Sequence, residues 1–370
     1  MNVLAPAAAR ASLQQRRDEA PRGAYLKNAW YAIAWSDEIG RSLFPRTILD
    51  TPIVLFRDTE DRVVALRDRC PHRFAPLHRG TLSGGIVQCP YHGLQFDSAG
   101  RCVHNPHGSG VLPKAATVPA YPAVERFMLV WLWMGVPELA DESKLPDFSY
   151  VDDPALTTIK GMVQGAGHYE LYADNIMDLG HAQFLHTGLG APAFTKGARE
   201  VRQEGETVWS NVASLNEELA PLHAAIKQLV GRRLDWWVDV RWNAPANMDL
   251  TLYVDEVGGS RQTAKWFDRN FHVITPQTTT SSFYFWALSR NYRVNDTELS
   301  LQLKAGLDAA FADEDKPMIV AQQAAMGGEG FWDLHPVLLP CDAGAIRARR
   351  VLAKLIAAET QEATGLASPE

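Results

Sequence analysis

The chain has 370 residues, of which 46% are hydrophobic and 21% are charged, and its formal net charge is −7. This composition is typical of a globular protein with a large core, and it excludes a mainly disordered chain. The acidic balance argues against a nucleic-acid partner, and four cysteines are too few for a disulfide scaffold.

Residues 1–24 are predicted to form a flexible N-terminal tail, because charged residues interrupt them and they lack the continuous apolar centre of a signal peptide. No apolar run elsewhere reaches the ~18 residues that a membrane span needs. We therefore expect no membrane association, and the cytoplasm is the expected location.

Residues 25–150 are predicted to form a small all-β domain. Short runs rich in β-forming residues are separated by turn residues, for example at 58–61 and 97–100. The clearest runs are 30–35, 53–56, 63–66 and 128–133. We expect the functional loops of this domain between Arg69 and Phe96.

The strongest motif lies in these loops. Cys70 and His72 form a C-x-H pattern, and after a spacer Cys89 and His92 form a C-x2-H pattern. Thiolates suit sulfide-bridged iron, whereas imidazoles suit an iron of higher reduction potential. Two such loops can hold a [2Fe–2S] cluster from both sides. A structural zinc site is the alternative, but zinc sites more often pair like ligands within one loop.

The pattern of Cys70, His72, Cys89 and His92 resembles the N-terminal domain of the Rieske non-haem iron oxygenases. The resemblance covers nearly all of the chain, from about residue 26 to residue 356, and is closest to the vanillate O-demethylase and dicamba demethylase group. It implies that the Rieske domain is followed by a helix-grip-like catalytic domain.

Residues 151–370 are predicted to form this mononuclear iron catalytic domain, which ends in a helix. Five runs have the pattern of strands and suggest an antiparallel sheet, namely 208–212, 234–240, 248–254, 271–275 and 281–288. Apolar residues at helical spacing follow at 301–311 and 346–356. The expected fold class is therefore α+β.

A second metal motif lies at residues 175–186. Two histidines and a carboxylate with open positions form the facial triad of non-haem Fe(II) oxygenases, and this segment contains His181 and His186. Their spacing of five residues corresponds to roughly 140° around a regular α-helix. Both rings can reach one metal only if the helix widens to π-type or breaks at Gly180. Asp178 is expected to share a helix face with His181.

The third iron ligand should be a carboxylate from a distant part of the chain. Asp313, Glu314 and Asp315 precede Pro317, and any of them could instead cap a helix that begins there. Spacing alone does not separate them. The resemblance to the O-demethylase branch implies Asp315 as the ligand, with Glu314 as the alternative.

The resemblance also implies a role for Asp178. In the family, an Asp three residues before the first His ligand joins two subunits of a homotrimer, here linking His92 of one chain to His181 of the next. A carboxylate that accepts from both imidazoles fixes their orientation. A helix salt bridge is the alternative reading. Asn175 is the second catalytic candidate.

The activity that the resemblance implies is that of a terminal oxygenase. It would use a [2Fe–2S] Rieske cluster, mononuclear Fe(II) and O2 to remove an O- or N-alkyl group from a small aromatic substrate, releasing an aldehyde. No nicotinamide fingerprint is present, so a ferredoxin, an NAD(P)H-dependent reductase, or both should supply electrons. Arg73, His78 and Arg79 could attract an acidic donor or merely solvate their loop.

The predicted substrate contacts are Phe283, Phe285, Asn175 and Leu185. In the acid-demethylating members, a His that helps to hold the substrate carboxylate corresponds to Phe283, and Phe cannot compensate a buried carboxylate. We therefore expect a neutral substrate such as an alkoxy arene or an N-alkyl anilide. If Phe283 is instead a core residue, Asn175 or Arg290 could contact the polar groups of the substrate.

Two alternatives remain open. One is a ring-hydroxylating or aromatic-acid O-demethylating (vanillate-like) oxygenase, which differs in product rather than in motif. The other is a non-catalytic Rieske electron-transfer protein. Iron content separates this second alternative, because a cluster plus a mononuclear site holds three irons and a cluster alone holds two.

Overall fold

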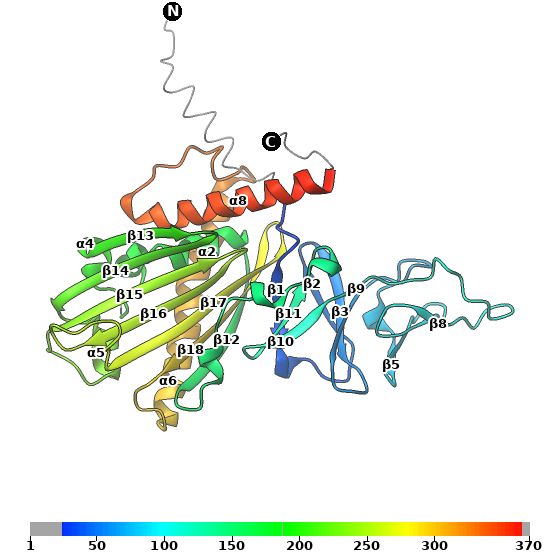
Figure 1. Cartoon of the computed structure of the whole chain (residues 1–370), viewed down its shortest axis with the longest axis horizontal. Helices are drawn as coiled ribbons and strands as arrows, with labels where there is room; N and C mark the ends of the chain where they lie inside the picture. Colours follow the sequence, from blue (N-terminus) through cyan, green and yellow to red (C-terminus); the bar gives the residue numbers. More distant parts are fainter. Residues whose placement is uncertain (1–23, 187, 365–370) are drawn as a thin grey trace, which may run out of the picture. The chain divides into compact units, whose positions relative to one another are not determined.

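A computed structural model describes residues 24–186 and 188–364 (Figure 1). Residues 1–23, which make up nearly all of the predicted N-terminal tail, lie outside the described residues. The chain divides into two compact units. Residues 27–145 and 275–279 form the N-terminal unit, and the C-terminal unit contains residues 146–274 and those from 280 onward.

The N-terminal unit consists of β-sheets, as the sequence predicts. Its described residues form three sheets with antiparallel pairing, in the orders β1-β11-β10, β2-β3-β4-β9 and β5-β6-β7-β8. The strands are β1 (Trp30–Trp35), β2 (Phe44–Ile48), β3 (Thr51–Arg57), β4 (Val63–Arg67), β5 (Thr81–Ser83), β6 (Ile86–Gln88), β7 (Gln95–Phe96), β8 (Cys102–His104), β9 (Ala120–Tyr121), β10 (Ala123–Arg126) and β11 (Leu129–Trp133). All four predicted runs are confirmed as strands.

The C-terminal unit is built on a seven-stranded sheet in the order β12-β18-β17-β16-β15-β14-β13. Its strands are β12 (Thr157–Ala166), β13 (Ala198–Glu204), β14 (Thr207–Glu217), β15 (Leu234–Asn243), β16 (Asn247–Asp255), β17 (Trp266–Thr278) and β18 (Ser281–Arg290). Strands β13 to β17 pair antiparallel in succession, and so do β12 and β18. The five predicted strands and the predicted antiparallel sheet are confirmed.

Helices pack on this sheet, so the α+β class is also confirmed. The longer ones are α2 (Tyr169–Met177), α5 (Pro221–Ile226), α6 (Thr297–Ala309), α7 (Lys316–Met326) and α8 (Ala343–Thr364). Helix α8 contacts β13, β14 and α2, whereas α6 and α7 contact β12 (Figure 1). None of the described helices is long and apolar enough to cross a membrane.

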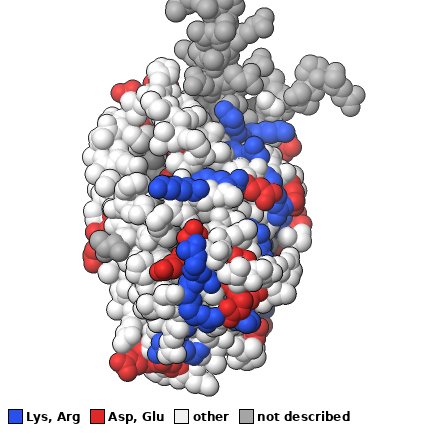
Figure 2. All heavy atoms as spheres, turned by 90° about the vertical axis from the view of Figure 1, so that its left-hand side faces the viewer, with Lys and Arg blue, Asp and Glu red and all other residues white. Residues whose placement is uncertain are grey.

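Basic and acidic side chains are interspersed on the face of the molecule that Figure 2 shows. That face therefore has no large field of one sign.

A buried ion cluster joins α8 to α2. The Arg349 guanidinium donates to both carboxylate oxygens of Asp174 and, at 2.6 Å, to Glu170. Arg349 is 9% exposed, so the charges are largely removed from water. Burial raises the pKa of Asp174 to about 6, against the opposing charge of Arg349. Helix α2 leads directly into the 175–186 segment, and this cluster fixes its position.

Replacing Arg349 by Met should destabilise the protein by about 3–5 kcal/mol, because two acidic side chains lose their buried partner. Chemical denaturation monitored by circular dichroism measures this loss. The Arg350→Met variant is the matched control, because Arg350 is exposed on the same helix. Equal stability of the two variants would contradict a structural role of the cluster.

Candidate metal centres

Two loops of the N-terminal unit carry the first ligand set, and they share one backbone pattern. The amide of Cys70 donates to Ala75 O, and the amide of Phe74 donates to Cys70 O. In the second loop, the Cys89 amide donates to the carbonyl five residues later, and the Gly93 amide donates back to Cys89 O. Phe74 and Gly93 both have a positive φ, of 61° and 72°. The loops are therefore matching turns that each present a Cys at the same place.

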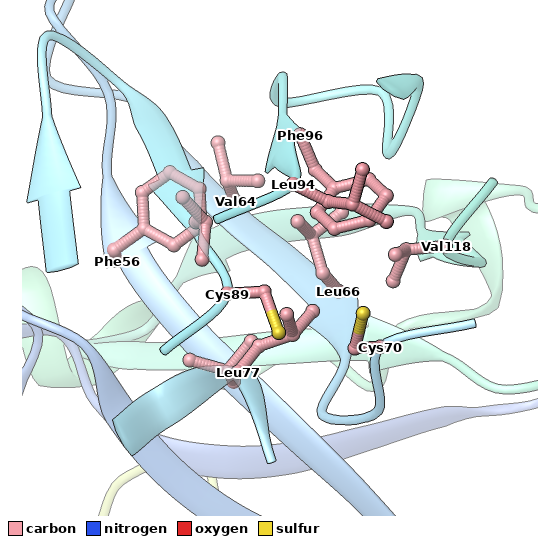
Figure 3. Close-up of a cluster of buried hydrophobic side chains, with 11 residues drawn as sticks. Phe56, Val64, Leu66, Cys70, Leu77, Cys89, Leu94, Phe96 and Val118 are labelled. Carbon is pink, nitrogen blue, oxygen red and sulfur yellow. The ribbon is translucent and has the colours of Figure 1, made fainter. Parts of the chain in front are cut away.

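The four side chains converge at the ends of these loops. Cys70 and Cys89 are each 1% exposed and belong to an apolar cluster, in which Figure 3 shows both sulfur atoms on segments that face one another. The rings of His72 and His92 lie 4.4 Å apart between centroids. His72 is exposed and His92 is half-buried. The thiols thus lie on the buried side, and the imidazoles lie toward solvent.

This donor set fits a Rieske cluster. Burial, together with the neighbouring Cys89 thiol, raises the pKa of Cys70 to about 11. Two buried thiolates therefore need a cationic group between them, and an iron–sulfur cluster supplies it. The outward imidazoles would then belong to the iron nearer the surface, where electrons enter and leave.

The second ligand set depends on a break in a helix. Helix α2 ends at Met177, Asp178 adopts an extended conformation (φ −108°, ψ 98°), and a 3-10 turn η6 (Leu179–His181) leads into the short helix α3 (Ala182–Leu185). The Asp178 carboxylate caps η6 by accepting from the Gly180 amide at 2.8 Å. The predicted irregularity is confirmed, and it lies at Asp178. The expectation that Asp178 shares a regular helix face with His181 was wrong for the same reason.

The break brings His181 and His186 together with a distant carboxylate. Asp315 Oδ1 lies 3.3 Å from His186 Nε2 and 3.6 Å from His181 Nε2. Ligand atoms on adjacent positions of one metal, at bonds of about 2.1 Å, are separated by about 3.0–3.5 Å. Asp315 is 3% exposed and His186 is 6% exposed. These three residues fit a mononuclear iron site, and their assignment as ligands remains a prediction.

Asp315 reaches the histidines from a π-helix, η7 (Ala310–Asp315), between α6 and α7. This widened turn, a form often found at functional sites, presents two consecutive acids to one ring. Asp315 faces Nε2 of His186, whereas Glu314 Oε2 contacts Nδ1 of the same ring at 2.5 Å. Glu314, the alternative ligand, therefore occupies the position of an orienting group. Asp315 makes no helix-capping hydrogen bond.

The other two presumed ligands also have orienting partners. Nδ1 of His181 contacts the Asp178 carbonyl oxygen at 2.5 Å, and Asn175 Nδ2 donates to Asp315 Oδ1 at 3.0 Å. Such partners fix ring tautomers and ligand direction. Asn175 is thus placed against the presumed ligand set.

Replacing Glu314 by Gln should weaken iron retention and lower turnover by roughly 10–100-fold, because the Nδ1 proton of His186 loses a charged acceptor. Iron content after dialysis, measured beside turnover, tests this expectation. Asp313→Asn is the matched control, since Asp313 is exposed one residue earlier. Full iron retention and activity in Glu314→Gln would refute the orienting role.

A cavity of about 140 Å³ adjoins the three presumed ligands. Its lining is largely apolar and includes Leu250, Leu252 and Phe311. A dry cavity of roughly 150 Å³ is large enough to bind benzene, so this space suits one substituted aromatic ring. Among the described residues that line it, none is a Lys or an Arg.

Several predicted substrate contacts are not part of this cavity. Of the predicted set, Asn175 lines the cavity, whereas Phe283, Phe285 and Leu185 do not. Phe283 and Phe285 alternate along β18 with residues that face the helices, so they lie in the core on the opposite face of the strand. The cavity therefore gives no support to the prediction that these three residues contact the substrate. Arg290 is also outside the lining, and it donates to Ser300 Oγ and to backbone carbonyls.

Four further polar residues that line the cavity were missed. Asp268, Asn270 and His272 recur at every second position along β17, are all buried, and line the cavity together with His223 of α5. Their alternation is visible in the sequence and places them on one face of the strand, but such a pattern is equally typical of a solvent-facing side, so only the structure shows that they are buried.

Comparison with known proteins gives two family matches. Residues 29–122 match the Rieske [2Fe-2S] domain, and residues 166–358 match the vanillate O-demethylase oxygenase C-terminal domain. The chain is 41% identical to a chloroacetanilide N-alkylformylase oxygenase component of Rhizorhabdus wittichii, over 90% of this chain and 97% of that protein. It is 38% identical to a dicamba O-demethylase oxygenase component of Stenotrophomonas maltophilia, over 90% and 98%.

A solved structure shares the fold across both units. A crystal structure of dicamba monooxygenase bound to 3,6-dichlorosalicylic acid matches with a TM-score of 0.86 and 38% identity, covering 91% of this chain and 99% of the other.

Proposed function

The chain belongs to the Rieske non-haem iron oxygenases with a vanillate O-demethylase type catalytic domain, and from this premise we propose that it dealkylates a neutral aromatic ether or anilide. It is an oxygenase component that acts with a Rieske cluster and a mononuclear iron. Its similarity to N- and O-dealkylating relatives indicates dealkylation of aromatic substrates.

The observation that supports a neutral substrate is the cavity lining. Its described residues include no Lys or Arg, and its two aspartates already have partners, Lys227 for Asp268 and the presumed iron site for Asp315. Burial lowers the pKa of His272 to about 3, so this ring is neutral at pH 7. A substrate carboxylate would therefore find no cationic side chain to pair with in this cavity. The cavity lining thus supports the expectation of a neutral substrate, whereas Phe283, on which the sequence argument relied, does not line this cavity.

The net reaction is R–O–CH3 + O2 + 2 e⁻ + 2 H⁺ → R–OH + HCHO + H2O, with the N-alkyl case analogous. The mononuclear iron, when bound, supplies the activation of O2. We assign its binding to His181, His186 and Asp315, while Asn175 and Glu314 keep two of these ligands oriented. The apolar walls would hold the aromatic ring with its alkyl carbon toward these three residues, and they would exclude water from that space.

Separate proteins must deliver the electrons, because the chain carries no nicotinamide fingerprint. We propose a ferredoxin or an NAD(P)H-dependent reductase that docks near the exposed Arg73 and Arg79. His78 is held by Asp68 and adds little to that patch. Since nicotinamide-driven reductases work inside cells, we also propose a cytoplasmic location.

We propose a homotrimer in which Asp178 connects His92 of one subunit with His181 of the next. The Asp178 carboxylate is half-buried and engages the Gly180 amide through one oxygen. In the proposed trimer, His181 Nδ1 would turn from the Asp178 carbonyl oxygen to the Asp178 carboxylate, which would then accept from both imidazoles and shorten the path for an electron.

The test compares 4-methoxybenzamide with 4-methoxybenzoate, using purified oxygenase and a surrogate reductase with formaldehyde release as the readout. We expect kcat/KM to favour the amide by at least about tenfold. Equal values for the two would refute the neutral-substrate proposal. Hydroxylated products without formaldehyde would favour a ring hydroxylase instead.

A further inference from the structure

His223 lies on α5 where two cavities meet. It lines the cavity beside the presumed iron ligands and a second cavity of about 220 Å³. Its Nδ1 atom is buried, has no hydrogen-bond partner, and lies 3.8 Å from Asp268 Oδ2. The His223 side chain is nevertheless 23% exposed. Because Nδ1 is buried, the exposed part of the imidazole ring is its other side, which borders the two cavities.

Asp268 is a fixed anion beside this ring. Its carboxylate accepts from Tyr292 Oη at 2.7 Å and from the buried Lys227 ammonium. Asp268 is 1% exposed. Burial would raise its pKa, but the charge of Lys227 and the hydrogen bonds from Lys227 and Tyr292, together with the nearby His223, outweigh burial and hold that pKa below its usual value. Asp268 therefore stays ionised and cannot move to follow a ligand.

A fixed carboxylate next to Nδ1 decides how the neutral ring is protonated. Burial, reinforced by the Lys227 charge, lowers the pKa of His223 to about 4, so the ring carries one proton at pH 7. The negative Asp268 favours this proton on Nδ1, and the other nitrogen, Nε2, then carries a lone pair. A lone pair on Nε2 can accept a hydrogen bond but cannot donate one.

We propose that Asp268 and His223 form a specificity pair, in which His223 Nε2 accepts a hydrogen bond from an N–H or O–H group of the substrate. Asp268 is the positioning residue of this pair. The inference rests on the proposed function, since it concerns the substrate of the same site. It also narrows the substrate class to alkyl ethers that carry an N–H or O–H group, because an N-alkyl anilide or any other arene without a donor would leave His223 unpartnered.

The second cavity indicates where the rest of such a substrate lies. Its apolar wall comes from α6, through Leu299, Leu303 and Leu307. Gly306 also lines it, and a Cβ added there would meet no heavy atom within 4 Å. His223 borders both cavities. A substrate whose donor group binds to His223 would therefore place its aromatic ring in the first cavity and its acyl chain in the second. A secondary N-acyl aniline has this order of groups: ring, N–H and acyl chain.

The first experiment measures how strongly the enzyme prefers an N–H donor. The probes are 4-methoxybutyranilide and its N-methyl analogue, assayed by chromatography of the O-demethylated phenol, since an N-methyl group can itself release formaldehyde, and titrated by calorimetry. We expect the wild type to favour the N–H probe by about tenfold in kcat/KM and Kd. His223→Leu should remove this preference, and His223→Gln should restore part of it, because the Gln oxygen can accept. Thermal melting of both variants shows whether they fold.

The outcomes separate this inference from the proposed function. If the probes are demethylated but His223→Leu still prefers the N–H probe as strongly as the wild type does, the specificity pair is wrong, whereas the proposed dealkylase function is retained. If no probe is demethylated, the proposed function fails, and the calorimetric preference still decides the role of His223. Equal affinity for both probes, or no measurable binding of either, overturns the pair.

A second variant tests the second cavity. Gly306→Leu should lower kcat/KM for 4-methoxybutyranilide by about tenfold while leaving 4-methoxyacetanilide nearly unchanged. Ala305→Leu is the matched control, since Ala305 is exposed on the same helix and lines neither cavity. An equal loss for both probes in Gly306→Leu would identify the space as an entrance for all substrates, and would overturn its assignment to the acyl chain.

Discussion

Replacing His181 by Ala is expected to abolish aldehyde release, lowering turnover by roughly 1,000-fold or more, while leaving the Rieske cluster intact. His181 supplies one of three presumed ligands, and the loss of one ligand removes several kcal/mol of metal binding. The ligand lies in the C-terminal unit, whereas the cluster cysteines lie in the N-terminal unit. The variant should therefore keep its visible spectrum and lose about one iron per chain.

The matched control for this variant is His104→Ala. His104 is an exposed histidine of β8 and belongs to neither ligand set. It should leave iron content and turnover unchanged. If His181→Ala kept more than about a tenth of wild-type turnover with wild-type iron content, His181 would not be a ligand of the catalytic metal.

Replacing Cys89 by Ser should have the second large effect, the loss of the cluster together with its colour. Cys89 is 1% exposed within an apolar cluster. A serine hydroxyl there would be a poor iron ligand, and it would also be a buried polar group with no hydrogen-bond partner. We expect sulfide near zero, no Rieske signal after dithionite reduction, and no turnover with any electron donor. The N-terminal unit should also melt at a lower temperature.

Cys102→Ser controls for the general effect of losing a thiol. Cys102 is half-buried, packs against the same apolar cluster, and lies outside the C-x-H and C-x2-H patterns. It should keep the cluster and its spectrum. A Cys89→Ser variant that retained two sulfides per chain and a Rieske signal would contradict the assignment of Cys89 as a cluster ligand.

The strands and the cluster loops were predictable because their signals are local. Runs such as 128–133 and 281–288 carry β-forming residues between turns, and the spacing within the cluster motifs is set by a single loop each. The break in the 175–186 segment was also predictable. His181 and His186 are five residues apart, so their rings could not reach one metal ion from a regular α-helix. Helix geometry alone therefore required an irregularity.

The π-helix that carries Asp315 could not be predicted in the same way. Nothing in the spacing of Glu314 and Asp315 distinguishes ligand from orienting group, because both face His186 only once the turn widens. The resemblance to a known family selected Asp315, and the structure then gave Glu314 a separate place on the ring.

The substrate cavity was the least predictable part. Phe283 was assigned to it from a sequence correspondence, but a one-residue difference along a strand moves a side chain to the other face. The residues that line the cavity come from separate strands and helices, such as His223 of α5 and His272 of β17. Only the tertiary fold brings them together.

A single-turnover experiment without any electron-transfer protein tests the central claim most directly. The oxygenase would be reduced with dithionite, freed of excess reductant, and mixed with O2 and a panel of neutral methoxy- and N-alkyl aromatics. We predict formaldehyde or a related aldehyde from at least one compound, in proportion to the O2 consumed, and none in His181→Ala. Oxidation of the cluster with no aldehyde from any compound, in protein whose iron analysis shows both centres filled, would contradict a dealkylating oxygenase.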